Sequence, residues 1–102
     1  VLSALESALA RRRTSAAGKS YTRSLLDAGA PKIGAKLREE ADELARALAE
    51  ESEARVAAEA ADVVYHLMVG LLHRGVPLAA VQAELARRFG TSGHEEKASR
   101  SR

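Results

Sequence analysis

Apolar residues recur every three or four positions along most of the 102-residue chain, which is the spacing of one face of an α-helix. In residues 2–13 the recurring residues are leucines. The segment ends in three arginines, whose positive charge complements the negative C-terminal end of a helix. A connection of small residues then leads to a short helix expected over 21–28, with Ser20 as its N-cap. Pro31 fits the first position of a long helix, which an apolar stripe extends to residue 50.

The second half of the chain predicts two more helices. Ser52 is a candidate cap for a helix over about 53–73, which is apolar nearly all round and therefore reads as buried. Gly75 suits the left-handed position that closes such a helix. Pro77 restarts the chain, and spaced apolar residues predict a last helix over 78–89.

Composition supports helices rather than sheets. Hydrophobic residues make up 46% of the chain, yet only 3% of residues are aromatic, and alanine is abundant. Small, Ala- and Leu-rich cores suit closely packed helices, whereas strands favour β-branched and aromatic residues. We therefore predict an all-α, four-helix bundle-like protomer. Residues 1–90 are expected to form a single domain, and 91–102, which lack core-forming residues, a mobile polar tail.

Charge and cysteine content narrow the class of protein. The chain has no cysteine, so disulfides and thiolate metal sites are excluded, and we expect a cytoplasmic protein without a signal peptide. No run reaches the roughly 18 consecutive apolar residues that would span a bilayer. The net charge of +2 combines arginine-rich ends with an acidic middle, which differs from the continuous basic face of a nucleic-acid-binding protein.

Two acidic clusters on the long predicted helices carry the candidate chemistry. Their acids are Glu39, Glu40, Asp42 and Glu43 on one helix, and Glu59 and Asp62 on the next. Residues three or four apart share a helix face, and the 15 residues between Glu43 and Glu59 allow the two helices to run antiparallel. Carboxylates gathered at about 4 Å repel by roughly 4 kcal/mol per pair at an effective dielectric of about 20. The gathering predicts a magnesium site, because Mg²⁺ binds carboxylate oxygens together with phosphate and water.

The two clusters do not carry equal weight. The glutamates of the first helix would also fit a solvated face, since Lys36 precedes Glu40 by one helical turn. Glu59 and Asp62 lie in an apolar helix, where a carboxylate must be paired, protonated or metal-bound. Arg55 and His66 are the nearest cations, and each could satisfy only one acid. His66 could instead orient a ligand carboxylate, although a satisfied core histidine is the favoured reading.

Several segments together resemble a known family. Glu39-Glu40-Ala41-Asp42-Glu43 and Glu59-Ala60-Ala61-Asp62 resemble the acidic motifs of the all-α nucleoside triphosphate pyrophosphatase (MazG-like) superfamily. The segments Ser20-Tyr21-Thr22 and Asp62-Val63-Val64-Tyr65-His66 are similar to those of its phosphoribosyl-ATP pyrophosphohydrolase family. Two departures are Arg38, where a glycine usually precedes the glutamates, and Pro77, which replaces a common serine-type cap.

The resemblance implies a function, a cofactor and a set of site residues. It implies a homodimer that hydrolyses phosphoribosyl-ATP with Mg²⁺ to phosphoribosyl-AMP and pyrophosphate, in histidine biosynthesis. The implied metal-binding and catalytic residues are Glu39, Glu40, Glu43, Glu59 and Asp62, and the implied substrate-binding residues are Ser20, Tyr21, Thr22 and Lys36. Two alternatives stay open: a house-cleaning pyrophosphatase of ordinary or damaged nucleoside triphosphates, and a non-catalytic helical dimer or adaptor that binds nucleic acid through Arg11, Arg12 and Arg13.

Overall fold

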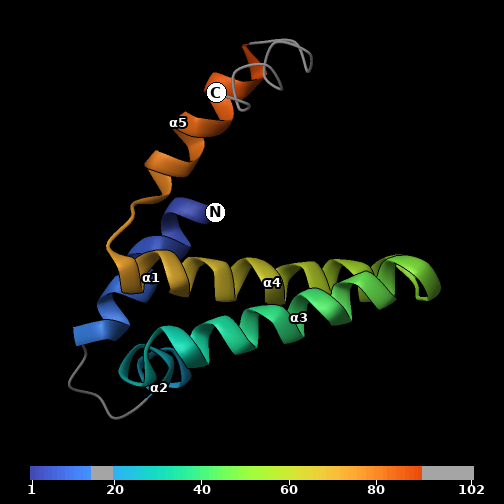
Figure 1. The fold of residues 1–102 in the computed structure, drawn as a ribbon, viewed down its shortest axis with the longest axis horizontal. Helices are drawn as coiled ribbons and strands as arrows, with labels where there is room; N and C mark the ends of the chain where they lie inside the picture. The colour runs from blue at the N-terminus through green and yellow to red at the C-terminus, as the bar shows by residue number, and fades with distance from the viewer. Residues whose placement is uncertain (15–19, 91–102) are drawn as a thin grey trace.

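The computed structural model describes residues 1–14 and 20–90, and these form five helices and no strand (Figure 1). In chain order the helices are α1 (Leu2–Thr14), α2 (Tyr21–Ala28), α3 (Ala30–Glu50), α4 (Glu53–Arg74) and α5 (Leu78–Phe89). The all-α prediction is confirmed, and every helix lies within one residue of its predicted bounds. The predicted mobile tail, 91–102, lies outside the described residues.

Local capping explains where the helices begin and end. The hydroxyls of Ser20 and Ser52 each accept a hydrogen bond from the backbone N–H three residues on, at 3.1 and 3.3 Å. Gly75 closes α4 in the left-handed conformation, with φ of 70°, as predicted. Helix α3 begins at Ala30 after Gly29, so Pro31 is its second residue rather than its first.

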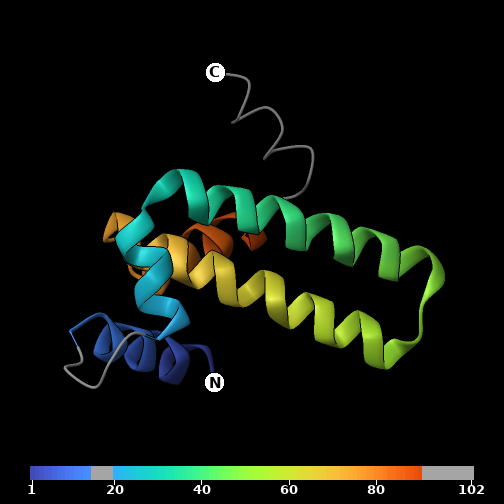
Figure 2. The same cartoon turned by 90° about the horizontal axis from the view of Figure 1, so that it is seen from below.

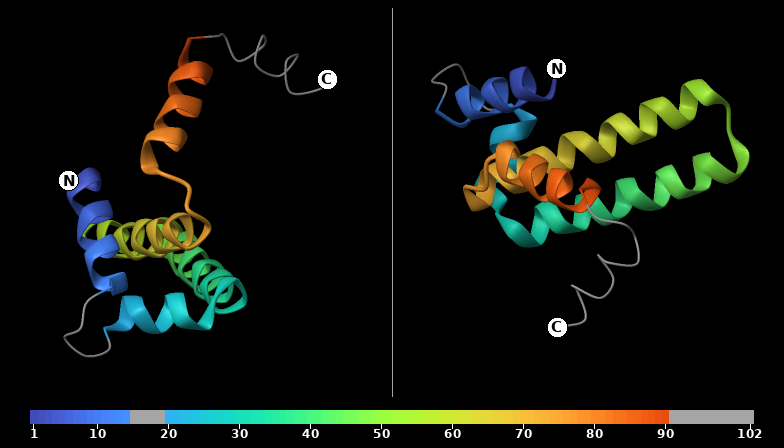
Figure 3. Two further views of the ribbon diagram at one scale, coloured as in Figure 1. Left: turned by 90° about the vertical axis from the view of Figure 1, so that its left-hand side faces the viewer. Right: turned by 90° about the horizontal axis from the view of Figure 1, so that it is seen from above.

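A long hairpin is the main feature of the fold. Helices α3 and α4 run antiparallel and lie side by side along their lengths (Figures 1 and 2). Viewed end-on, α1, α2 and α3 lie around the C-terminal half of α4 (Figure 3). Helix α5 extends away from the hairpin (Figure 1). Within one chain, therefore, the helices cover only one end of the hairpin.

The hydrophobic core lies at that covered end. Its buried members come from all five helices and are Leu9, Leu25, Ile33, Met68, Val69 and Leu78. The predicted apolar stripe of α3 fades towards the hairpin tip, where Leu48 is 67% exposed. Burial of α4 all round was also wrong for a single chain, because among the described helices only α3 lies along the N-terminal half of α4 (Figures 1 and 2). Ala57, Ala58 and Ala61 are exposed there.

Helix α4 is long and apolar enough to cross a membrane by length and composition, with a mean hydropathy of 1.2 over 18 residues. It nevertheless carries Glu59 and Asp62 and packs along the whole of α3. An apolar helix with an exposed flank needs a further surface to cover it.

A contact between distant parts of the chain starts α5. Pro77 precedes this helix and supplies no side-chain cap. The Glu6 carboxylate of α1 takes that role, because its Oε2 accepts a hydrogen bond of 2.7 Å from the Leu78 N–H. An acid on α1 thus satisfies the first turn of a helix 72 residues away in sequence.

Candidate metal centre and its polar surroundings

Three glutamates meet between α3 and α4. Glu40 and Glu43 come from α3 and Glu59 from α4, and each contributes one carboxylate oxygen to a group lying within 4.8 Å of one another. Glu40 is 8% exposed and Glu59 is 6% exposed, and Oε2 of each is buried without a hydrogen-bond partner among the described residues. Buried carboxylate oxygens without partners are costly, so this group calls for a cation.

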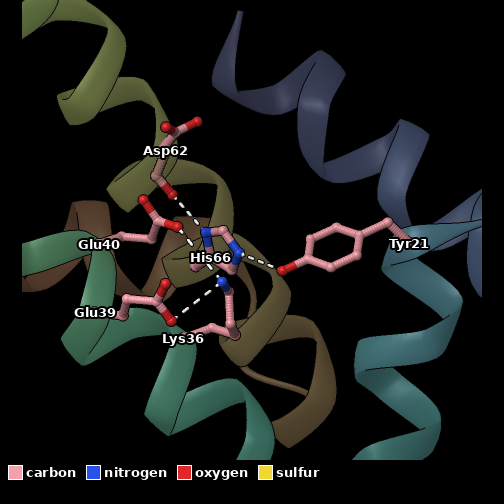
Figure 4. A network of polar contacts seen from close by, with 6 residues as sticks. All are labelled: Tyr21, Lys36, Glu39, Glu40, Asp62 and His66. Carbon is pink, nitrogen blue, oxygen red and sulfur yellow. Dashed lines mark hydrogen bonds and ion pairs between the residues drawn. The ribbon is translucent and has the colours of Figure 1, made fainter. Parts of the chain in front are cut away.

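The other two predicted ligands flank the group. Glu39 is exposed, and its Oε2 accepts a bond of 3.2 Å from Lys36 Nζ, which also lies 3.8 Å from Glu40 Oε1 (Figure 4). Asp62 follows Glu59 by three residues, but its side chain is exposed rather than embedded. The structure thus gathers three of the five predicted ligands and leaves Glu39 and Asp62 at the rim.

Burial and mutual repulsion raise the pKa values of two glutamates in the cluster. Burial raises the pKa of Glu40 above its ordinary value, and the neighbouring Glu43 carboxyl raises it further. Burial likewise raises the pKa of Glu59; the Arg55 guanidinium opposes this rise, and Glu43 adds to it. Without a cation, the cluster therefore favours retention of protons that a metal ion would displace.

The two cations considered from the sequence have different roles. Arg55 pairs with Glu59 through one oxygen only, which leaves Oε2 unsatisfied. His66 does not pair with the Asp62 carboxylate. Its Nδ1 instead lies 2.7 Å from the Asp62 backbone carbonyl, while Nε2 lies 3.0 Å from the Tyr21 hydroxyl (Figure 4). His66 is buried and hydrogen-bonded at both nitrogens, as in the core-histidine reading.

The predicted substrate-binding residues divide into accessible and buried groups. Tyr21 is 51% exposed, and burial of its ring raises the pKa of its hydroxyl, partly offset by the Lys36 charge. Ser20 Oγ is occupied in capping α2. Thr22 is fully buried and hydrogen-bonded to the Tyr65 hydroxyl, so this conformation offers no direct contact between Thr22 and a ligand. The Thr22–Tyr65 hydrogen bond links α2 to α4.

The sequence alone does not predict this polar link between Thr22 and Tyr65. The Tyr21 and Tyr65 rings stack at 6.1 Å and 17°, and His66 meets both rings edge-on. The signal that could have found the link is the pairing of adjacent polar and aromatic residues, Tyr21-Thr22 on one helix and Tyr65-His66 on another. Choosing the partners needs the packing of α2 against α4.

The donor set fits a hard divalent cation. All available groups are carboxylate oxygens, the ligands that Mg²⁺ and Ca²⁺ prefer, and no sulfur or imidazole nitrogen joins the described group. Two buried carboxylate oxygens of this group of residues, Oε2 of Glu40 and of Glu59, have no partner among the described residues. The side chains therefore suit a divalent cation with oxygen ligands. The neighbouring ammonium group of Lys36 could bind an anion.

Comparison with known proteins indicates that the chain is a pyrophosphohydrolase of the all-α class. Residues 2–89 match the family described as phosphoribosyl-ATP pyrophosphohydrolase. The chain is 54% identical to the phosphoribosyl-ATP pyrophosphatase of Azorhizobium caulinodans, over 99% of this chain and 93% of that protein. It is 50% identical to that of Rhizorhabdus wittichii, over 97% and 93%, and 47% identical to that of Rhodospirillum rubrum, over 100% and 87%. The chain belongs to the phosphoribosyl-ATP pyrophosphohydrolase family.

Proposed function

We propose that this chain hydrolyses phosphoribosyl-ATP to phosphoribosyl-AMP and pyrophosphate in histidine biosynthesis, with Mg²⁺ as the cofactor. The observation that carries the proposal is the group of three glutamates with two buried, unpartnered oxygens, in a chain of this family. Membership of a hydrolase family leaves the nucleic-acid adaptor without support, so no nucleic-acid partner is proposed.

Glu40, Glu43 and Glu59 would hold the metal ion, with Glu39 and Asp62 at the rim of the site. Bound there, Mg²⁺ would neutralise charge on the phosphates and lower the pKa of a bound water. Either rim carboxylate, being exposed, can complete the ligand set or accept the proton of the attacking water as general base. This division of roles follows the exposure of the side chains.

Lys36 is proposed to bind the negatively charged phosphates of the substrate. It lies between Glu39 and Glu40, and its hydrogen bond to Glu39 raises its pKa, which favours the ammonium form. Ser20 and Tyr21 lie at the start of α2, and the Lys36 charge acts on the Tyr21 phenol; both residues are proposed to contact the substrate. Thr22 would act indirectly, by holding α2 against Tyr65.

We also propose that residues 1–90 form one domain that works as a homodimer in the cytoplasm. Leu48 and Leu67 are exposed on the hairpin, as are Ala57, Ala58 and Ala61 of α4, and a second copy of the hairpin would cover such apolar side chains. Light scattering should give a mass of twice the 10.8 kDa chain, and Leu48→Glu should shift it towards the monomer.

The assay that tests the function measures pyrophosphate release from phosphoribosyl-ATP beside a panel of common and damaged nucleoside triphosphates. Phosphoribosyl-ATP should be turned over fastest, and phosphoribosyl-AMP should appear in equal amount to pyrophosphate. Faster turnover of a common triphosphate would favour the house-cleaning alternative and overturn the proposed substrate.

A further inference from the structure

A chain of two hydrogen bonds links the exposed Tyr21 to the turn of α4 that carries Asp62. The Tyr21 hydroxyl lies 3.0 Å from His66 Nε2, and His66 Nδ1 lies 2.7 Å from the Asp62 backbone carbonyl (Figure 4). The two side chains are 45 residues apart in sequence. The buried imidazole therefore sits between the half-exposed Tyr21 side chain and the helix that carries Glu59 and Asp62.

The direction of the hydrogens along this chain follows from the chemistry of its ends. A backbone carbonyl can only accept, so His66 Nδ1 must carry the hydrogen. In the neutral imidazole the other nitrogen, Nε2, is then an acceptor. The Tyr21 hydroxyl must donate to it, and a phenol has only one hydrogen to give. Its oxygen is left with acceptor capacity alone.

The position of that oxygen is fixed as well as its polarity. The Tyr21 ring stacks on Tyr65 with centroids 6.1 Å apart, and His66 holds the hydroxyl end. Half of the residue remains exposed, and Lys36 is near enough for its charge to act on the phenol. A fixed acceptor therefore stands beside the ammonium that would receive phosphate.

We propose that Tyr21, positioned by His66, is a specificity-determining acceptor that takes a hydroxyl or amino hydrogen from the sugar or base of the ligand. Ionised phosphate oxygens carry no hydrogen, so they cannot bond to an oxygen whose only hydrogen already points at His66. This inference rests on the proposed nucleotide substrate, because it divides the ligand between two groups: Lys36 for phosphate and Tyr21 for the hydroxyl or amino group.

Three variants separate the parts of the hydrogen-bond chain. Tyr21→Phe removes only the hydroxyl and keeps the stacked ring. His66→Asn keeps a donor at the Nδ1 position for the Asp62 carbonyl but loses the acceptor for Tyr21. His66→Gln is the matched opposite, since its amide oxygen can reach the Nε2 position. Circular dichroism checks that each variant is folded. If a His66 variant does not fold, Tyr21→Phe still tests the proposal, because Tyr21 lies at an exposed position.

Calorimetric titration with AMP, inosine monophosphate, ribose 5-phosphate and inorganic pyrophosphate, each with Mg²⁺, gives the decisive comparison. Tyr21→Phe and His66→Asn should each lower the binding affinity for at least one of the three hydrogen-donating ligands by about 5- to 10-fold. The double variant should lose no further affinity. His66→Gln should weaken the same ligand less, and pyrophosphate should bind all variants equally. A loss for AMP alone assigns the adenine amino group, and a loss for ribose 5-phosphate assigns a sugar hydroxyl.

The proposal is overturned if Tyr21→Phe lowers the affinity for pyrophosphate as much as the affinity for the other ligands, or if it changes the affinity for none of them. Failure of the wild type to bind any hydrogen-donating ligand also contradicts it. Nitrogen NMR of His66 in the ligand-free protein gives a separate readout: the hydrogen should lie on Nδ1, and the Nε2 signal should move in Tyr21→Phe. A hydrogen on Nε2 would overturn the proposal, whereas failure of the proposed substrate would leave this NMR result unchanged.

Discussion

Two groups of acids in this molecule respond in opposite ways to their surroundings. On α5, Glu84 accepts hydrogen bonds from Arg87 at 2.5 Å and from Arg88 at 3.1 Å, and these lower its pKa to about 2. Between α3 and α4, the burial of Glu40 and Glu59 raises the pKa of each. The residue type is the same, but one acid is surrounded by cations at the surface and the others by acids in the interior.

The difference separates a structural charge pattern from a functional one. Glu84 has its compensation within one helical turn and needs nothing further. The glutamates of the cluster have two partial compensations, the Arg55 pair with Glu59 and the Lys36 pair with Glu40, and they retain two unpartnered oxygens. Such uncompensated burial persists where a ligand supplies the missing charge.

The largest expected effect is loss of turnover on removing one carboxylate from the cluster. Glu43→Gln should lower pyrophosphate release by at least about 100-fold, because the charge stabilisation provided by a bound metal is worth several kcal/mol. Steady-state assays with phosphoribosyl-ATP check this. Glu84→Gln is the matched control and should keep wild-type turnover. Equal activity in both variants would remove the functional distinction between the two groups.

A smaller effect concerns the metal-free protein. Glu40→Gln should raise its melting temperature near neutral pH by a few degrees, because the substitution removes a buried charge beside Glu43. Mg²⁺ should stabilise the wild type against heat and should stabilise Glu40→Gln much less. Thermal unfolding with and without Mg²⁺ measures both. A lower melting temperature for metal-free Glu40→Gln would contradict the account of repulsion.

The pH dependence of stability sharpens the comparison, because the two groups act with opposite sign. The folded-state pKa values of Glu40 and Glu59 are raised, so their contribution to stability is full below the ordinary pKa of about 4.3 and is lost as pH rises through the folded values. Metal-free wild type should therefore lose stability, relative to Glu40→Gln/Glu59→Gln, from about pH 4 upwards. Urea unfolding across pH measures this, and a constant difference would contradict it.

The smallest effect belongs to Glu84, whose pairs are exposed. Its lowered pKa contributes stability above the ordinary value of about 4.3, and that contribution is lost as pH falls through about 2. Glu84→Gln should thus be slightly less stable at neutral pH and equal to the wild type near pH 2. A large loss of stability at neutral pH would show that these exposed pairs matter more than such pairs usually do.

The helices could be predicted from sequence because their signals are local. The spacing of leucines, the Ser20 and Ser52 caps and the Gly75 closure each act within one or two helical turns, and all are confirmed. The acids of the cluster were also identified from local spacing on two helices. Their grouping required only that the helices run antiparallel, which a short connection imposes.

Contacts between distant segments could not be predicted in this way. Pro77 was noted as a departure from a serine-type cap, but nothing near it in sequence indicates that Glu6 caps α5 instead. The Tyr21–His66 bond likewise depends on how α2 packs against α4. Asp62 was expected to be embedded, since apolar neighbours in sequence suggest burial, yet its side chain is exposed among the residues that the structure describes.

Calorimetric titration of Mg²⁺ into the metal-free protein near pH 6 tests most directly whether the cluster between α3 and α4 is a metal centre. Wild type and Glu84→Gln should bind the ion, because the buried Oε2 atoms of Glu40 and Glu59 have no partner in the metal-free protein. Glu43→Gln should bind weakly or not at all. Equal Mg²⁺ binding by Glu43→Gln and Glu84→Gln would contradict the account.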